Sequence, residues 1–368
     1  MPKRRPAKKR SPAAAVLLAV LCLLLLAVSR YLDSRSEPAA SVSAPEAAQA
    51  DAPKLEVHFL DIGQGDSALL FRGDEALLID GGKVKNNQKL IARLKELEVD
   101  HLDAVICSHP DEDHCGGLSA VLASTRTDAF YCSVDSWHTK IFSDVTKYVE
   151  QQGISVTVPQ AGDSFAFGEA NVEFLGPVED YGDDPNEGSL VARVRYGETS
   201  FLFTGDMGFE AEDDMLAAGV DVSATVLKVA HHGSAGSSST EFLQAVHPQY
   251  AVISVGADND YGHPTEAALN RLAACGIPVY RTDLLGEIIA VSDGKTVTIS
   301  SASNEAPPAS DAASQTTGSY GYVGNSSSKV VHLAGCGKLP GESNRVYFAS
   351  LDEALAAGYR KHANCLGN

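Results

Sequence analysis

Short apolar runs that end in a charged or imidazole side chain recur along the middle of this chain. Four such runs, at 76–79, 103–107, 199–203 and 226–230, have the length and composition of buried strands. Asp or His follows each run within three residues, as Asp80, His109, Asp206 and His231. Strand ends are rigid positions from which loops can aim side chains accurately. We therefore expect these polar residues to converge on one site.

Helical periodicity separates some of these strands. Residues 87–97 place Leu90, Ile91, Leu94 and Leu97 at helical spacing, and 141–149 form a second amphipathic segment. Residues 190–203 predict a hairpin that turns at Gly197. Strand runs and single helices thus alternate along two halves of a region of about 250 residues, which is long enough for one sizeable two-sheet core. This order favours an α/β sandwich with helices outside two sheets, an αββα arrangement.

The N-terminus has the pattern of an export or anchoring segment. An unbroken apolar run at 13–28 follows six basic residues, and its length lies between a signal-peptide core of ~7–15 and a membrane span of ~17–25 residues. Basic residues on this flank hold the N-terminus in the cytoplasm. We expect a cell-membrane anchor with an extracellular domain, or a secreted protein if the segment is cleaved.

Two segments rich in Ser, Ala, Pro or Thr are predicted to be flexible linkers. They divide the sequence into a basic tail with membrane anchor or signal at 1–33, a linker at 34–54, a large domain at 55–303, a linker at 304–319, and a small module at 320–368.

The charge balance limits the partners of the large domain. The chain of 368 residues has 29 Lys and Arg against 48 Asp and Glu, a net charge of −19. Without the six N-terminal basic residues, 23 basic side chains stand against 48 acidic ones, which leaves −25. Such a surface does not favour broad electrostatic capture of DNA. Contact with nucleic acid must therefore be local.

The highest concentration of possible metal-ligating side chains lies in Ser108-His109-Pro110-Asp111-Glu112-Asp113-His114-Cys115-Gly116-Gly117. Four potential ligands (His109, Asp111, Asp113 and His114) fall within six residues, where a strand ends and a Gly-Gly turn begins. Two carboxylates and two imidazoles are costly to gather in a tight loop without a cation. The alternative is a solvated acidic turn.

Several segments together resemble the metallo-β-lactamase-fold hydrolases, specifically the ComEC-type competence-protein branch. The matching segments are 57–67, 78–82, 108–117, 186–190, 204–206, 227–234 and 261–264, and they extend over roughly residues 55–301. The resemblance implies an αββα fold and a hydrolase that uses two divalent ions.

The implied metal ligands are His109, Asp111, Asp113, His114, Asp206 and His232. The general family has a His where this chain has Asp111, and Asn186 and Ser189 replace a further His. A set richer in oxygen favours Mn²⁺ more than an all-imidazole set would, and Zn²⁺ stays open. The resemblance places His109 and Asp111 on one ion, Asp113, His114 and His231 or His232 on the other, and Asp206 between them.

The implied reaction is hydrolysis of a phosphoester by a metal-activated hydroxide. Asp113 would orient the nucleophile and shuttle a proton, and His231 would serve as acid or substrate contact. Asp66 and Asp80 would support the ligands from behind. Lys228 and Ser234 would contact an anionic substrate, or be a solvated Lys and a turn Ser. His263 would line the mouth of the site, or cap a helix that begins near Thr265.

The last fifty residues resemble the metal-binding domain of the Ada DNA-repair protein, although the usual Cys-x-x-Cys end is His362-Ala363-Asn364-Cys365 here. His332, Cys336, His362 and Cys365 have the spacing and number of a structural Zn²⁺ site. A module this short needs a bound metal or a cross-link to fold on its own. A Cys336–Cys365 disulfide, which export would permit, is the alternative.

These observations lead to three hypotheses. The first is an exported, membrane-anchored dinuclear-metal phosphodiesterase or nuclease that acts on extracellular DNA or a related phosphodiester. The second keeps the enzyme class but makes the substrate a cell-wall or lipid phosphoester. The third is a non-catalytic surface-binding protein. An intact ligand set argues against the third hypothesis, because a binding protein does not need it.

Overall fold

The computed structural model describes residues 54–302 except 258, and residues 322–333, 338–341, 344–348 and 351–366 near the C-terminus. The predicted anchor and almost all of the two predicted linkers lie outside these residues, so the predicted domain boundaries stay predictions. Within the described ranges, no helix is both long and apolar enough to cross a membrane.

Two large sheets form the centre of the main domain. The first has the order β17-β16-β1-β2-β3-β5-β7-β8. It is antiparallel from β17 to β3 and parallel from β3 to β8. Its strands are β1 (Leu55–Phe59), β2 (Ala68–Arg72), β3 (Glu75–Ile79), β5 (Ala104–Cys107), β7 (Phe130–Cys132), β8 (Val156–Thr157), β16 (Ile288–Ser292) and β17 (Val297–Ser301).

The second sheet has the order β15-β14-β13-β12-β11-β10-β9. It is parallel from β12 to β15, so that the carboxyl ends of these strands share one edge. The strands are β9 (Ser164–Phe167), β10 (Ala170–Gly176), β11 (Val191–Tyr196), β12 (Thr199–Phe203), β13 (Val226–Lys228), β14 (Tyr250–Ile253) and β15 (Val279–Arg281). The predicted hairpin is β11–β12, and Gly197 takes the left-handed conformation at its turn (φ 58°).

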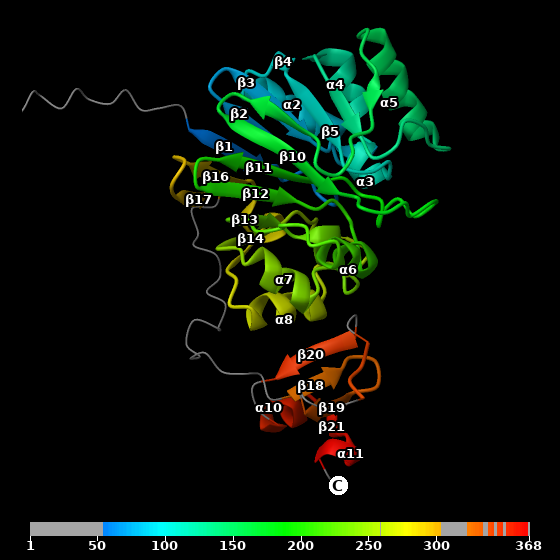
Figure 1. The fold of residues 1–368 in the computed structure, drawn as a ribbon, viewed down its shortest axis with the longest axis vertical. Helices are drawn as coiled ribbons and strands as arrows, with labels where there is room; N and C mark the ends of the chain where they lie inside the picture. Colours follow the sequence, from blue (N-terminus) through cyan, green and yellow to red (C-terminus); the bar gives the residue numbers. More distant parts are fainter. Residues whose placement is uncertain are drawn as a thin grey trace, which may run out of the picture. The chain divides into compact units, whose positions relative to one another are not determined.

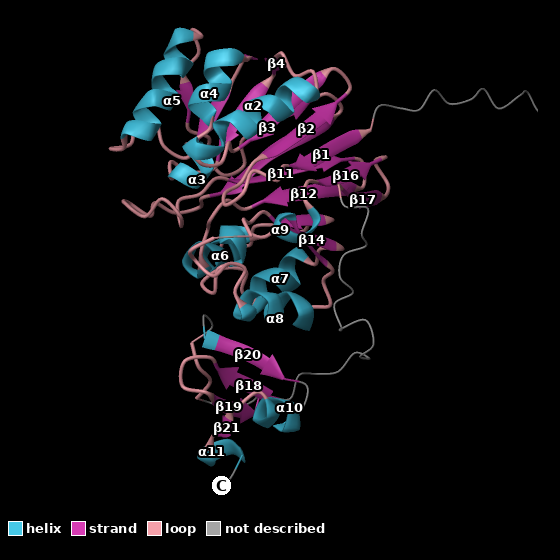
Figure 2. Cartoon of the chain, turned by 180° about the vertical axis from the view of Figure 1, so that it is seen from behind, coloured by secondary structure: helices cyan, strands magenta, loops and turns pink. Residues whose placement is uncertain are grey.

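Helices cover the outer face of each sheet (Figures 1 and 2). On the first sheet, α2 (Asn87–Glu96), α4 (Leu118–Ser124) and α5 (Lys140–Gln151) bury their apolar sides against strand residues such as Leu78 and Val105. On the second sheet, α6 (Phe209–Ala217), α7 (Thr240–Val246) and α8 (Glu266–Ala274) do the same. The predicted helices at 87–97 and 141–149 correspond to α2 and α5.

A third apolar core lies between the two sheets and contains side chains from both, among them Phe59, Phe174 and Phe203. Together with the two outer layers it makes the αββα sandwich, which confirms the predicted fold. The short elements are β4 (His101–Leu102), β6 (Arg126–Thr127), α3 (Glu112–Cys115), α9 (Thr282–Leu285), and the 3-10 turns η1 (Val84–Asn86) and η2 (Ala230–Gly233). The predicted strand at 226–230 is shorter than expected because η2 begins at Ala230.

The C-terminal residues form a small sheet of their own, with the order β20-β18-β19-β21. Val331, Val346, Phe348 and Tyr359 make its compact core. Its elements are β18 (Tyr322–Asn325), β19 (Val330–Leu333), β20 (Arg345–Phe348), β21 (Arg360–Lys361), α10 (Leu351–Ala356) and α11 (Ala363–Leu366).

Candidate metal centre

The loop after β5 brings two buried imidazoles together. The chain leaves β5 at Cys107 and enters α3 at Glu112, so His109 and His114 stand on either side of a tight turn. Their rings are 4.1 Å apart between centroids, and both side chains are fully buried. The local spacing of the motif therefore produces convergence rather than a solvated turn.

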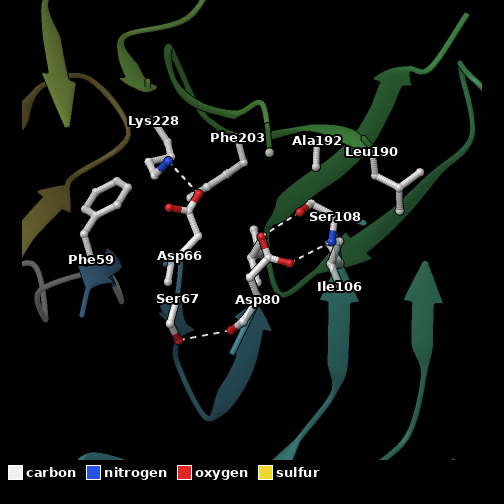
Figure 3. Close-up of a pocket in the computed structure, with 13 residues that line it drawn as sticks. Phe59, Asp66, Ser67, Asp80, Ile106, Ser108, Leu190, Ala192, Phe203 and Lys228 are labelled. Atoms are coloured by element: carbon white, nitrogen blue, oxygen red, sulfur yellow. Dashed lines mark hydrogen bonds and ion pairs between the residues drawn. The ribbon is translucent and has the colours of Figure 1, made fainter. Parts of the chain in front are cut away.

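Asp80 holds this pair from the end of β3. Its carboxylate accepts hydrogen bonds from the backbone N–H and the hydroxyl of Ser108, at 2.7 and 2.8 Å (Figure 3). The same carboxylate lies 2.9 Å from Nδ1 of His114. The contact leaves Nε2 of His114 facing the site. A carboxylate behind a ligand histidine fixes its ring orientation and raises its basicity. Asp80 thus lies where the predicted supporting residue should be.

The second sheet supplies the other side of the centre. Asp206 follows β12, and its Oδ1 lies 3.0 Å from Nε2 of His114. His232 lies in η2, where its Nδ1 is 2.9 Å from the carbonyl oxygen of Ser254. The opposite ring nitrogen, Nε2, is 3.6 Å from Asp206 Oδ2 and 3.7 Å from Asp113 Oδ2. The two sheets therefore aim ligand atoms at a common point.

The donor set fits divalent cations. Several buried polar atoms facing this point make no hydrogen bond of normal geometry to any described residue: Nε2 of His109, His114 and His232, and Oδ1 of Asp206. Of these, His114 Nε2 and Asp206 Oδ1 lie 3.0 Å apart as an ion pair. Such atoms are costly to bury unpaired. Asp66, His114, Asp206 and His232 each place one ligand atom within 4.8 Å of the others. Cations bound here would satisfy all of these atoms.

The charges of the groups agree with this fit. Burial lowers the pKa of His109 to about 3, which keeps its imidazole neutral, the form that binds metals. Burial alone would raise the pKa of Asp206, but the neighbouring His114 and His232 outweigh it and hold that pKa well below its usual range. Against the effect of burial, Asp206 and Asp66 raise the pKa of His232 to about 9. The carboxylates thus create a field that favours positive charge.

Asp66 and Lys228 form a buried pair beneath the centre (Figure 3). Asp66 Oδ2 lies 2.5 Å from Lys228 Nζ, and its Oδ1 lies 3.1 Å from Nδ1 of His232. Lys228 is only 3 % exposed and also donates to the carbonyl of Val229. It is therefore neither a solvated lysine nor open to a substrate, which corrects both expectations for this residue. Its ammonium neutralises Asp66 from the protein side.

An open cleft of about 180 Å³ leads to the centre. Two residues that line it were not predicted as site residues: Gln64, from the loop between β1 and β2, and Tyr261. Both lie inside segments that carried the family resemblance, which was the one available signal. The lining residues are Gln64, Asp111, Asp113, Asn186, Asp206, His231, His232, Tyr261 and His263.

The remaining candidates have distinct places. Ser189 is buried, and its hydroxyl accepts from the backbone N–H of Asp206 and lies 3.4 Å from His109 Nδ1. His263 lines the cleft, while the side chain of Thr265 itself caps α8. Ser234 accepts a hydrogen bond from the N–H of Gly236 within its own turn. Ser189 thus lies behind His109, His263 faces the cleft, and Ser234 fits the turn interpretation.

In the C-terminal module, the described part of the predicted ligand set converges. His332, His362 and Cys365 each offer a ligand atom within 4.8 Å of the others, and the two imidazole rings are 4.0 Å apart. Cys336 lies outside the described residues. The choice between a zinc site and a Cys336–Cys365 disulfide therefore stays open, as does the resemblance to the Ada module.

Comparison with known proteins identifies relatives of the main domain. The family described as the metallo-beta-lactamase superfamily matches residues 60–257. Competence protein ComA of Neisseria gonorrhoeae is 34% identical over 285 residues, which are 76% of this chain and 38% of that protein. ComE operon protein 3 of Bacillus subtilis is 30% identical over 251 residues, 63% of this chain and 32% of that protein. The chain thus spans about a third of the length of these relatives.

Solved structures with similarity to the chain include the metallo-beta-lactamase fold protein YhfI from Bacillus subtilis. It is 15% identical in sequence, with a TM-score of 0.45, and the match covers 67% of this chain and all of that one.

Proposed function

Because this chain belongs to the metallo-β-lactamase superfamily, whose fold is that of metal-dependent hydrolases, we propose that it hydrolyses phosphodiesters with two divalent ions bound at this centre. One observation carries the proposal. Buried imidazole and carboxylate atoms from both sheets converge without hydrogen-bond partners among the described residues, directly beneath an open cleft.

The geometry supports a division of the ligands between two ions. His109 Nε2 and Asp111 Oδ2 are 3.9 Å apart and form one side. Asp113, His114 and His232 form the other side, and Asp206 lies between the two. We choose His232 over His231 as the ligand because His232 is buried and faces Asp113 and Asp206, whereas the side chain of His231 is 30 % exposed. The assignment stays a prediction.

Two bound ions would lower the pKa of water and stabilise the charge that develops on the phosphoester oxygens. In the proposed mechanism, Asp113 orients the attacking water and accepts its proton, since its carboxylate lines the cleft. His231 also lines the cleft, with Nε2 3.7 Å from Asp206 Oδ2. A proton held on this nitrogen is placed to reach the leaving oxygen. Ser189 and Asp80 position the ligands from behind.

DNA is the phosphodiester that the relatives suggest. The two relatives are named Competence protein ComA and ComE operon protein 3. We propose that this chain acts on extracellular DNA or a related phosphodiester, from an exported and membrane-anchored position. The acidic composition means that substrate capture depends on the centre itself rather than on a broad basic surface.

The first test measures hydrolysis of bis-p-nitrophenyl phosphate by the purified chain with Mn²⁺ or Zn²⁺. We expect turnover that Asp113→Ala lowers at least about 100-fold, because the variant loses both a proton acceptor and a metal ligand. Asp74→Ala removes an exposed carboxylate in the turn between β2 and β3 and serves as the matched control. Equal rates in all three proteins, or the absence of bound metal, would contradict the proposal.

A cell-wall or lipid phosphoester is the second candidate substrate, and the acidic composition favours it. Comparison of a DNA oligonucleotide with a phosphocholine ester separates the two. A non-catalytic binding protein would not bind metal and would not hydrolyse any of these esters.

A further inference from the structure

Tyr261 is an exposed aromatic ring at the edge of the cleft. It is 60% exposed, more than any other large apolar side chain in the described part of the chain, yet it lines the cleft with Asp111 and His231. A large ring left in water beside a reaction centre is a natural contact for a ligand that itself has an apolar face.

The loop that carries Tyr261 is fixed by hydrogen bonds. The side chain of Asn259 accepts from the N–H groups of Tyr261 and His263, at 3.2 and 3.0 Å. Its amide donates to the carbonyl oxygens of Gly256 and His263, at 2.8 and 2.7 Å. The ring of Tyr261 then stacks on that of His263, with centroids 5.8 Å apart and planes at 27°. Binding to this ring therefore costs little ordering of the loop.

A positive charge lies between the ring and the metal ligands. Lys83 Nζ is 5.0 Å from the centroid of Tyr261 and donates to its hydroxyl at 3.4 Å. The same nitrogen lies 3.9 Å from Asp113 Oδ2. In a chain with a net charge of −19, this ammonium is placed where an anion would approach the centre.

From this arrangement we propose that Tyr261 and Lys83 form a nucleotide subsite. The Tyr261 ring stacks on the base next to the scissile phosphodiester, and the Lys83 ammonium contacts a phosphate oxygen. The inference rests on the proposed function and narrows its substrate class to nucleotide phosphodiesters. Because every base has a π-face, the subsite accepts any of them without reading sequence.

The position of Lys83 also argues against a choline ester. Quaternary ammonium groups bind to the faces of aromatic rings, and Tyr261 alone would suit one. Here Lys83 already places a cation close to that ring, and a second cation would be repelled by it. A neutral, flat base meets no such repulsion.

The test compares two phosphates that differ only by the base. Thymidine 5′-monophosphate and deoxyribose 5-phosphate are titrated calorimetrically into the Mn²⁺-loaded full chain. We expect the wild type to bind the nucleotide about tenfold tighter or more. Tyr261→Ala should abolish this preference without weakening deoxyribose 5-phosphate, and Tyr261→Phe should keep it. Lys83→Met should weaken both ligands by a similar factor.

Leu284→Ala, which removes an exposed apolar side chain from α9, is the matched control and should change neither affinity. Equal binding of the two phosphates by the wild type would overturn the subsite, and so would a Tyr261→Ala variant that weakens both alike. Tighter binding of phosphocholine than of the nucleotide would overturn it as well. These readouts need no turnover, so a wild type that prefers the nucleotide but does not hydrolyse bis-p-nitrophenyl phosphate would refute the hydrolysis and retain the subsite.

Discussion

At the scale of single residues, Glu212 on α6 is a titratable group outside the cleft that couples pH to stability. Its carboxyl is fully buried and accepts the backbone N–H groups of Ser238 and Ser239, in the segment that follows η2. Burial raises the pKa of Glu212 to about 8, although these donors and the charge of Arg271 oppose the rise. The folded protein therefore keeps this group protonated at pH values where the unfolded chain, with a pKa near 4.5, has lost the proton.

The sign of the resulting pH dependence follows from this difference. The folded state binds the proton more strongly, so the stabilising contribution is complete below about pH 4.5 and is lost as the pH rises to about 8. Between pH 5 and 8.5, urea unfolding should show the free energy of unfolding of the wild type falling by about a few kcal/mol more than that of Glu212→Gln. The glutamine of this variant does not titrate. Reading the difference between the two proteins cancels the titration of His114 and His232. The prediction would be contradicted if the free energy of unfolding of Glu212→Gln fell as much as that of the wild type, or more, between pH 5 and 8.5.

At the scale of elements, the ends of β3 and α3 pack backbone against backbone. Gly81 N–H donates to the carbonyl of His114 at 2.7 Å, and Gly117 N–H donates to that of Gly82 at 2.8 Å. A Cβ atom at Gly117 would lie 2.1 Å from the carbonyl oxygen of Gly81. The ligand loop is therefore held in place by a contact that only glycine permits.

Gly117→Ala should force these two elements apart and shift His114. We expect a loss of about 1–3 kcal/mol in the free energy of unfolding, together with weaker binding of Mn²⁺ or Zn²⁺. Chemical denaturation and a chelator competition measure the two effects. Gly236→Ala is the control, since the nearest atom to its added Cβ is 3.9 Å away. Equal stability of the two variants would show that the contact is not tight.

At the scale of the whole domain, the centre joins the two sheets. His109 and His114 follow the first sheet, whereas Asp206 and His232 follow the second. An ion bound between them stabilises only the state in which both sheets are folded and docked. Such binding adds about 2.7 kcal/mol when the free ion is at 100 times its dissociation constant.

Removal of metal should therefore lower the midpoint of thermal unfolding of the main domain. Fluorescence of Trp137 reports on this domain alone, because the chain has one tryptophan. Excess EDTA should lower the midpoint in the wild type, and Asp206→Ala should make the midpoint insensitive to EDTA. A wild-type midpoint that ignores EDTA would argue against metal at this centre.

The sequence was most informative where the chemistry is local. His109, Asp111, Asp113 and His114 fall within six residues, so one turn suffices to gather them, and the αββα order followed from strand and helix periodicity. The contact between Asp66 and Lys228 could not be predicted, because it joins residues far apart in sequence from different sheets. No sequence pattern marks Tyr261 itself as a site residue. It lines the cleft because the fold brings its loop next to the ligand loop.

The first sheet combines the first strand of the main domain with its last two strands. The last two strands, β16 and β17, join the sheet beside its first strand, β1, with Leu55 opposite Ser292. A chain that ends before Ile288 would leave β1 as an exposed edge, with unpaired backbone groups and apolar residues such as Val57 beside them. Such edges pair readily with other chains. Protection of the main domain against aggregation thus depends on the strands of that domain that are synthesised last.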